Sequence, residues 1–600
     1  MDRKSIIILI CSFVLLMVWY PMLNKLYPPK PLPQTNALAR ASNQLALSTN
    51  AASPAALSAN TNANASPAVP AAVPAARTTV PEQLLVVTNQ NGYYTFTSRG
   101  GGLKLIELQN YPDTIACGKN TKVHETNYAS LNTRAPIPIL ALVNGEALEG
   151  DGHFDLKPLA DGVRAEKILP SGLSLVKEFH LGTNYLFIAK IRLENTSTNA
   201  IFLAKQEWNI GTATPLSIYD PGTAVGAFWY NGTAAEHIQE GWFANRTLGC
   251  IPGTPRTEFQ GGANNVVWAA VHNQFFALAV VPKDPAPGIV SRRIELPPPS
   301  PETLAQESKA VRQPVGYQTA LVYPSGALAP GQSMEKIFTV YAGPKEYNTL
   351  AKIGLEMKND LDAVMDFGGF FGFFAKMLLL SMRGLVSFGL TYGWAIVIIT
   401  VIIKLLFWPL TLASTRSMKR MQTLQPQMKE LQNKYKDDPK KQQQKLMEFY
   451  KEHKINPVGS CLPILLQIPV FFGFYRMLQS AIELRGATFL WACDLSKPDT
   501  ILFLGGFPIN PFPLIMGVTM LYQARLTPAS PGMDPAQQKI MKYMPLMFMV
   551  FLYNMSAGLT LYWTVQNLLT IVQTKVTSPG QDPADAKKNA LPANPPRKKK

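Results

Sequence analysis

The sequence has no signature of an enzyme or of a nucleotide-driven machine. It contains no Gly-rich phosphate-binding loop ending in Lys-Ser/Thr, no His-Glu-x-x-His and no pair of cysteines at metal-ligand spacing, and its six histidines are scattered. These absences argue against an ATP-driven pump and a zinc protease, and we expect no cofactor, no metal and no catalytic residue. A serine-based intramembrane protease stays open, because motifs alone do not exclude it.

Cysteine is scarce as well, with five residues in a chain of 600. That number is too small for a disulfide framework, and Cys11 and Cys461 lie in or beside apolar runs, where a thiol behaves as a small hydrophobe. Cys117 and Cys250 remain as the candidate pair. Nothing local constrains them to the separation that a disulfide needs, so the sequence leaves open whether they pair.

Charged residues make up only 16% of the chain, whereas hydrophobic residues make up 47%. The run 396–412, interrupted by Lys404 and a few neutral polar residues, matches the roughly 20 residues that a helix needs to cross a bilayer. The net charge of +17 could indicate nucleic-acid binding, but the Lys and Arg residues flank apolar runs, as the positive-inside rule requires. The composition therefore indicates a polytopic α-helical membrane protein.

The N-terminal apolar run has the flanks of an uncleaved membrane anchor. Residues 1–24 begin with charged side chains and lack a cleavage site of small residues, since Trp19-Tyr20-Pro21 stands where one would be expected. We expect the N-terminus to be cytoplasmic. Residues 25–81 are rich in Ala, Pro, Ser and Asn, a composition that predicts a disordered tether.

Two segments with different sequence patterns follow the tether. Residues 82–343 show short apolar or alternating runs punctuated by Gly and Pro, which predicts a large all-β sandwich lying outside the cytoplasm. Residues 344–390 have apolar positions three and four apart, and Lys376 and Arg383 share one helical face. This pattern favours an amphipathic helix in the membrane interface, with a crossing helix as the alternative.

Five further spans are predicted within 391–575, giving six with the anchor. Residues 413–457 interrupt them with eleven Lys or Arg against five Asp or Glu, and Asp437-Asp438-Pro439 divides this segment into two helices. We therefore expect a cytoplasmic helical hairpin there. Six spans also place the basic tail, 576–600, in the cytoplasm.

Lys404 is the most informative residue of the second span. An ammonium group inside such a helix costs roughly 2.5–3.5 kcal/mol on insertion scales, so it usually faces water or a partner. Thr400 lies one turn away on the same face, and Gln467 adds a polar group from another span. Two other interpretations stay open: Lys404 snorkels to the cytoplasmic interface, and the scattered polar residues only join helices.

Four segments resemble the YidC family of membrane insertases, relatives of the mitochondrial Oxa and chloroplast Alb proteins. They are Asn-Pro-Val-Gly-Ser-Cys-Leu-Pro-Ile-Leu-Leu-Gln-Ile-Pro-Val-Phe at 456–471, the stretch 418–431 with its Leu-Gln-Pro, Asp-Pro-Ala-Gln-Gln-Lys-Ile-Met at 534–541, and Ser-Ala-Gly-Leu-Thr-Leu-Tyr-Trp at 556–563. The likeness is close over about 345–575. The anchor, tether and β domain resemble the layout of the Gram-negative bacterial form.

The resemblance implies a substrate groove and its residues. In that family a positive residue, usually Arg, projects from the second span into a hydrophilic groove that is open to the cytoplasm and the lipid. Lys404 stands at that position, and Thr400 matches a substrate-contacting Thr one turn earlier. An aromatic pair in the last span appears as Tyr562-Trp563 instead of Tyr-Tyr, and Gln467 completes the expected groove.

The implied function is that of a membrane protein insertase and chaperone of the bacterial inner membrane, acting alone or with the Sec translocon. Its expected partners are nascent membrane proteins and membrane lipids, with the ribosome as a further candidate. The alternative is a small-molecule membrane transporter, because Lys and Gln residues also line transport pathways, although no internal repeat supports it. A structural scaffold whose β domain does the work is a second rival.

Overall fold

The computed structural model describes most of the β region and most of the helical region. The described residues are 80–115, 117, 127–245, 254–307, 310–435, 438–453, 462–526 and 535–576. The predicted anchor at 1–24, nearly all of the tether, Cys250 and the tail beyond Val576 lie outside them.

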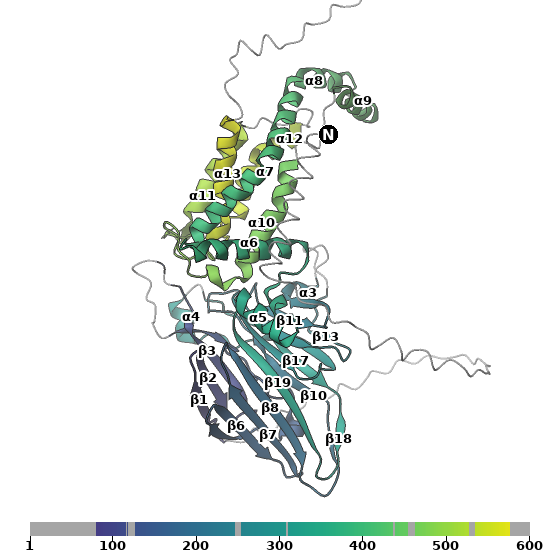
Figure 1. Cartoon of the computed structure of the whole chain (residues 1–600), viewed down its shortest axis with the longest axis vertical. Coiled ribbons are helices and arrows are strands. Elements are labelled where there is room, and N and C mark those ends of the chain that lie inside the picture. The colour runs from purple at the N-terminus through teal and green to yellow at the C-terminus, as the bar shows by residue number, and fades with distance from the viewer. Residues whose placement is uncertain are drawn as a thin grey trace, which may run out of the picture. The chain divides into compact units, whose positions relative to one another are not determined.

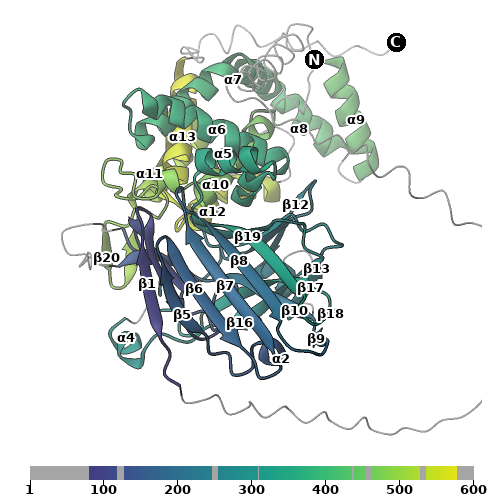
Figure 2. The same ribbon diagram turned by 60° about the horizontal axis from the view of Figure 1, so that its bottom comes forward.

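The large β sandwich predicted from the sequence is confirmed (Figures 1 and 2). Its N-terminal sheet has the order β1-β2-β3-β4, with bounds Leu84–Thr88, Gly92–Thr97, Gly102–Pro112 and Tyr128–Leu131. A nine-stranded sheet has the order β12-β11-β14-β15-β19-β8-β7-β6-β5. In that order its bounds are Ala235–Gln239, Gly226–Tyr230, Trp268–His272, Phe276–Pro282, Ser333–Pro344, Leu186–Asn195, Leu173–Leu181, Gly162–Ile168 and Asp155–Leu159.

A second four-stranded sheet and a small ribbon complete the β region. The sheet has the order β10-β17-β16-β13, with bounds Gln206–Ala213, Val315–Tyr323, Gly288–Glu295 and Glu258–Gly261. The ribbon pairs β18, Gly326–Leu328, with β9, Ile201–Leu203. Three short helices occupy connections: α2, Glu146–Glu149, α3, Glu240–Ala244, and α4, Pro301–Gln306.

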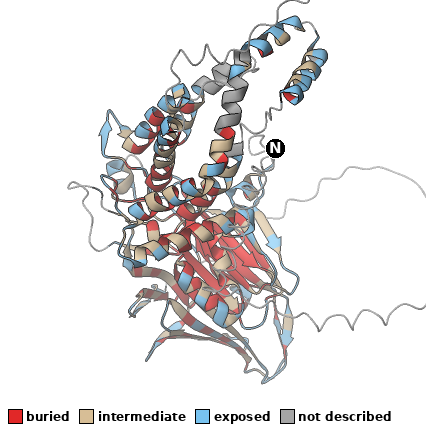
Figure 3. Cartoon of the chain, turned by 45° about the horizontal axis from the view of Figure 1, so that its top comes forward, coloured by how far each residue is buried: buried red, intermediate tan, exposed pale blue. Residues whose placement is uncertain are grey.

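Burial along the strands explains their sequence patterns. In β8, Phe187, Ala189, Ile191 and Leu193 are buried and the residues between them are exposed, which is the alternation of a sheet with one covered face. In β15 nearly every residue is buried, because its two faces belong to different cores. Figure 3 shows the buried residues gathered in the strands and exposed residues along the outer faces of the helices.

The second core of β15 is shared with the segment that follows the sheet. Helix α5, Tyr347–Met357, contributes Leu350 and Ile353 to the core that also contains Ala277 and Ala279 of β15. The 3₁₀ helix η1, Leu361–Met365, follows. The connection between α5 and η1 is fixed to the sheet, since the Trp268 indole N–H donates to the Asn359 carbonyl at 2.7 Å.

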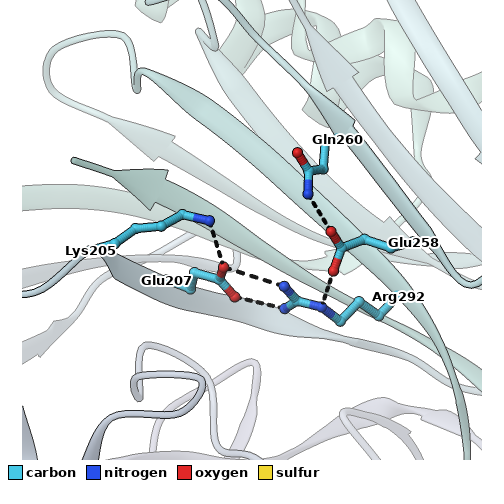
Figure 4. A network of polar contacts seen from close by, with 5 residues as sticks. All are labelled: Lys205, Glu207, Glu258, Gln260 and Arg292. Atoms are coloured by element: carbon cyan, nitrogen blue, oxygen red, sulfur yellow. Dashed lines mark hydrogen bonds and ion pairs between the residues drawn. The ribbon is translucent and has the colours of Figure 1, made fainter. Parts of the chain in front are cut away.

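A surface ion network spans the second four-stranded sheet (Figure 4). Arg292 of β16 donates to Glu207 of β10 at 2.7 Å and to Glu258 of β13 at 2.5 Å. Lys205 donates to Glu207 at 3.1 Å, and Gln260 donates to Glu258. Because Arg292 and Glu258 are partly exposed, we expect these ion pairs to add little to the free energy of unfolding. Their main effect is to join the strands β10, β16 and β13.

The helical region follows η1. Its elements are α6, Gly369–Ser387, α7, Tyr392–Thr423, α8, Gln425–Lys434, α9, Pro439–Glu452, α10, Leu462–Ser480, the 3₁₀ helix η3, Ile482–Leu484, strands β20, Leu502–Leu504, and β21, Phe507–Ile509, α11, Pro511–Leu526, α12, Pro535–Phe551, and α13, Ala557–Val576. Among the described residues, two helices are long and apolar enough to cross a membrane by length and composition, at Gly369–Ser387 and Tyr392–Ser414. The Asp438 carboxylate caps α9 by accepting from the Lys441 backbone N–H at 3.1 Å.

The candidate pairing of Cys117 with Cys250 is wrong, because Cys117 forms a disulfide with Cys493. The two residues are 376 positions apart in sequence, yet their Cα atoms are 5.5 Å apart, within the range that a disulfide requires. Arg485 contacts the same part of the β region, donating to the carbonyl oxygens of Pro112 at 2.5 Å and Asp113 at 3.0 Å. Proximity set by the fold, which no local pattern shows, decides the pairing.

Candidate functional site

Lys404 lies in the middle of α7 with its side chain almost enclosed by protein, since only 6% of the residue is exposed. Its Nζ donates to the hydroxyl oxygen of Thr570 on α13 at 2.7 Å. Among the described residues no carboxylate lies within ion-pair distance of it, and Thr570 is its one hydrogen-bond acceptor. An ammonium group has three N–H donors, so two remain available to a ligand or to water.

Threonines on α13 form a polar ladder with a spacing of four and six residues. The hydroxyls of Thr564, Thr570 and Thr574 donate to backbone carbonyls four positions earlier, at 2.7, 2.7 and 2.8 Å, and Thr560 does so at 3.3 Å. Such bonds satisfy the hydroxyl proton inside the helix and leave an oxygen lone pair facing outward. Thr570 can therefore accept from Lys404 while it donates to the Gln566 carbonyl.

Helix α7 adds two more threonines to the polar groups around Lys404. Thr400 is fully buried and donates to the Ile396 carbonyl at 2.6 Å. The Thr411 hydroxyl accepts from the Gln573 amide at 2.5 Å, which joins α7 to α13 a second time. We call the set Thr400, Lys404, Thr411, Thr570 and Gln573 the polar seam.

The aromatic pair of α13 faces α10. Tyr562 is buried and stacks on Phe474, with ring centroids 4.4 Å apart, and its hydroxyl lies near the side chain of Gln467. Trp563 is half-buried and packs edge-on against Phe471 at 4.9 Å. Its indole N–H has no hydrogen-bond partner among the described residues. Gln467 and Trp563 thus present polar atoms on the α10 side of the bundle.

The sequence-predicted site residues fall into two groups. Lys404 and Thr400 lie together on α7, whereas Gln467 lies with Tyr562, and within the described part of the chain no hydrogen bond joins Lys404 to Gln467. Sequence reasoning missed Thr570, whose signal was the recurrence of Thr and Asn at 560, 564, 567, 570 and 574 in an apolar helix. Spacings of three and four place such residues on one face.

Within the part of the chain that the structure describes, the two cations of α6, unlike Lys404, contact carboxylates or an aromatic ring. Arg383 donates to Glu483 at 2.9 Å and to Glu346 at 3.5 Å, and Lys376 lies over the Tyr347 ring at 4.9 Å. Both basic side chains therefore contact groups that adjoin the β region. In Figure 1 the axis of α6 runs across those of α7 and α10.

Comparisons with known proteins identify relatives across nearly the whole chain. The family described as 60Kd inner membrane protein matches residues 384–582, and the YidC periplasmic domain matches 150–380. The membrane protein insertase YidC of Syntrophus aciditrophicus is 32% identical over 96% of this chain and 98% of its own length. The same protein of Geobacter metallireducens is 31% identical over 98% and 100%. A crystal structure of an active YidC insertase is similar at 18% identity, covering 83% of this chain and 94% of that one, with a TM-score of 0.33.

Proposed function

This chain belongs to the YidC family of membrane protein insertases and is itself an insertase, and we propose that its polar seam receives the hydrophilic part of a substrate on the way into the inner membrane. The observation that supports this proposal is the hydrogen bonding of Lys404, a buried cation whose single acceptor among the described residues is the neutral Thr570 hydroxyl. A cation held in this state is poised to pair with an incoming carboxylate.

The proposed mechanism is physical and has no covalent step. Moving a substrate carboxylate from water into hydrocarbon is costly unless it is paired and hydrogen-bonded. The two available N–H groups of Lys404 can supply such pairing, and the seam hydroxyls can hold water beside it. Gln467 and Trp563 would add polar contacts from the α10 side. Burial of the apolar segment of the substrate in lipid then drives its release.

Short helices support a locally thinned membrane around the seam. Helices α11 and α12 contain 16 and 17 residues. At about 1.5 Å per residue they are roughly 24–26 Å long, less than the roughly 30 Å hydrocarbon core of a typical bilayer. We propose that α10, α11, α12 and α13 nevertheless cross, which with α7 and the N-terminal anchor gives the six spans and two cytoplasmic termini.

Helix α6 is proposed to lie in the outer interface. Its cations contact Glu346, Tyr347 and Glu483, all of which adjoin the β region, so a crossing helix would have to carry these charges away from their partners. The basic segment with α8 and α9 and the tail 576–600 are proposed as the cytoplasmic elements that recruit substrate or the ribosome. Chaperoning and cooperation with the Sec translocon belong to the same proposal.

Substitution of Lys404 tests the seam directly. In vesicles containing the purified chain, Lys404→Arg should retain insertion of a substrate with an acidic translocated segment, and Lys404→Ala should lower it about tenfold, the effect of roughly 1.4 kcal/mol. Lys404→Glu should lower it further, because like charges repel. Protease protection of the translocated segment is the measurement.

Two controls establish whether the loss of insertion comes from the charge in the seam. Lys376→Ala removes a cation of α6 that is partnered by Tyr347 and should leave insertion unchanged. A substrate with a neutral translocated segment should respond little to any Lys404 variant. The seam proposal fails if Lys404→Glu inserts the acidic substrate like the unchanged protein, or if a cysteine at 404 is inaccessible to water-soluble thiol reagents from the cytoplasmic side. Insertion by vesicles that contain no other protein would also set aside the small-molecule transporter.

A further inference from the structure

The connection between α10 and α11 carries a hairpin that no part of the proposed mechanism uses. Strands β20 and β21 pair from Leu502 with Ile509 to Leu504 with Phe507. The two residues at the tip, Gly505 and Gly506, have φ values of 58° and 84°, which suits a tight two-residue turn. Figure 2 shows β20 at the periphery of the helical region, below α11.

Both faces of this hairpin are apolar and exposed. Leu504 is 71% exposed, and its neighbour Phe503, whose side chain points to the opposite face, is 56% exposed. Ile501, Leu502 and Phe507 are also exposed. Ordinary hairpins bury one apolar face against a core and present polar side chains on the other, and this hairpin does neither.

The base of the hairpin is held firmly in place. The buried Asp499 carboxylate accepts from the Trp491 indole N–H at 2.9 Å and from the Phe512 backbone N–H at 2.6 Å. The Asn510 amide donates to the Tyr553 carbonyl at 2.8 Å. The exposure of the strands is therefore a fixed feature of the fold.

The surroundings of the hairpin are those of a membrane surface. From residue 500 to 524 the chain contains no Asp, Glu, Lys or Arg, and α11 continues directly with exposed apolar residues such as Val518. Trp491 and Tyr553 at the base are the residue types that concentrate at membrane interfaces. The disulfide of Cys493 with Cys117 places this connection on the side of the β region.

We propose that the β20–β21 hairpin is a lipid anchor, with its apolar strands inserted among the acyl chains of the outer leaflet of the inner membrane. A protein partner would cover one face of a two-stranded ribbon, whereas acyl chains surround both faces. The exposed apolar surface also continues without a charged break into the lipid-facing surface of α11. This anchor would fix the depth of the outer ends of α10 and α11.

The test uses the full chain in vesicles of phosphatidylethanolamine and phosphatidylglycerol. Cys11, Cys250 and Cys461 are replaced by Ser, and one nitroxide is attached at Phe503→Cys or Leu504→Cys. Phe202→Cys in β9, equally exposed at 71%, is the water-facing control, and Val518→Cys is the lipid-facing reference. Power saturation measures collisions with oxygen, which concentrates in lipid, and with a water-soluble nickel complex.

Labels at 503 and 504 should both behave like the label at 518, with oxygen collisions dominant and nickel collisions several-fold lower than at 202. Two results would overturn the proposal. Nickel accessibility at 503 and 504 equal to that at 202 would place the hairpin in water. Protection from both reagents at one of the two positions would show a protein cover on that face, from a second copy or another chain.

Discussion

The β region and the helical region each bury a lysine, and they treat its charge differently. Lys177 of β7 is fully buried and donates to three acceptors: the Glu149 carboxylate at 2.8 Å, the Gly100 carbonyl at 2.7 Å and the Leu140 carbonyl at 3.2 Å. Lys404 of α7 is nearly as buried, and within the described part of the chain it donates only to the Thr570 hydroxyl. All three ammonium donors are used in the first case and one in the second.

This difference in hydrogen bonding indicates that the charge of Lys177 is structural and that the charge of Lys404 is functional. A buried ion pair with a full set of hydrogen bonds is closed to any ligand, and breaking it is expensive, although replacing the whole pair with apolar residues often is not. A buried cation with vacant N–H donors makes the folded protein less stable, but it can bind an anionic ligand. The following predictions test whether this contrast is real, from the largest expected effect to the smallest.

The strongest test removes the counter-charge of Lys177. Glu149→Gln should lower the free energy of unfolding by about 3–5 kcal/mol, because it leaves a buried cation without its carboxylate. Thermal unfolding of the full chain in detergent is the measurement. The double variant Lys177→Met with Glu149→Leu should recover much of the loss. Lys404→Met should leave the free energy of unfolding unchanged or raise it. If Lys404→Met is instead as destabilising as Glu149→Gln, the proposed difference between the two lysines is wrong.

Severing the covalent link between the two regions should have the next largest effect. Cys117→Ser or Cys493→Ser should each lower stability by about 2–4 kcal/mol, and the double variant should add nothing further. A protease site introduced at 436–437 gives a direct readout on a denaturing gel, because the two unfolded fragments should stay joined without reductant only when both cysteines are present. Separation of the fragments of the unchanged chain without reductant would contradict the disulfide.

A third buried cation, Lys345, predicts a pH dependence. Burial lowers the pKa of Lys345 to about 7, and its Nζ lies 3.0 Å from the Nδ1 atom of His272. An unfolded lysine keeps its proton to about pH 10.5, so between pH 7 and 10.5 the unfolded state binds more protons and stability rises with pH. Lys345→Met should remove about 1–3 kcal/mol of this rise between pH 7 and 9. Burial also lowers the pKa of His237 to about 3, but this shift affects the free energy of unfolding only below pH 7.

Unfolding measured across that pH range in the two proteins is decisive. Parallel pH profiles for the unchanged chain and Lys345→Met would show that Lys345 does not titrate in this window.

The smallest expected effect concerns the acceptor of Lys404. Thr570→Val removes one hydrogen bond worth about 1 kcal/mol, so insertion of an acidic substrate should fall roughly fivefold. Thr570→Ser keeps the hydroxyl and should restore insertion. If Val and Ser variants insert alike, Thr570 only fills space beside Lys404.

Periodic features of the fold could be predicted from the sequence. The alternation of β8 indicated a half-covered sheet, and Lys404 with Thr400 could be placed on one face of a helix, because both patterns depend on neighbours within a few residues. Contacts between distant segments could not. The partner of Cys117 and the acceptor of Lys404 lie 376 and 166 positions away, where only packing decides what meets. The two-sided burial of β15 likewise depends on α5, which a single-strand pattern does not show.

The disulfide has a consequence for the order in which the molecule is made. At about 5–20 residues per second, Cys117 leaves the ribosome roughly 20–75 s before Cys493. During that interval Cys117 is already part of the chain, but Cys493 has not yet been synthesised. The bond can close only after α10 has been made and its connection to α11 has reached the β region. An oxidised Cys117–Cys493 pair is therefore a chemical record that α10 has been made and that its connection to α11 has reached the β region.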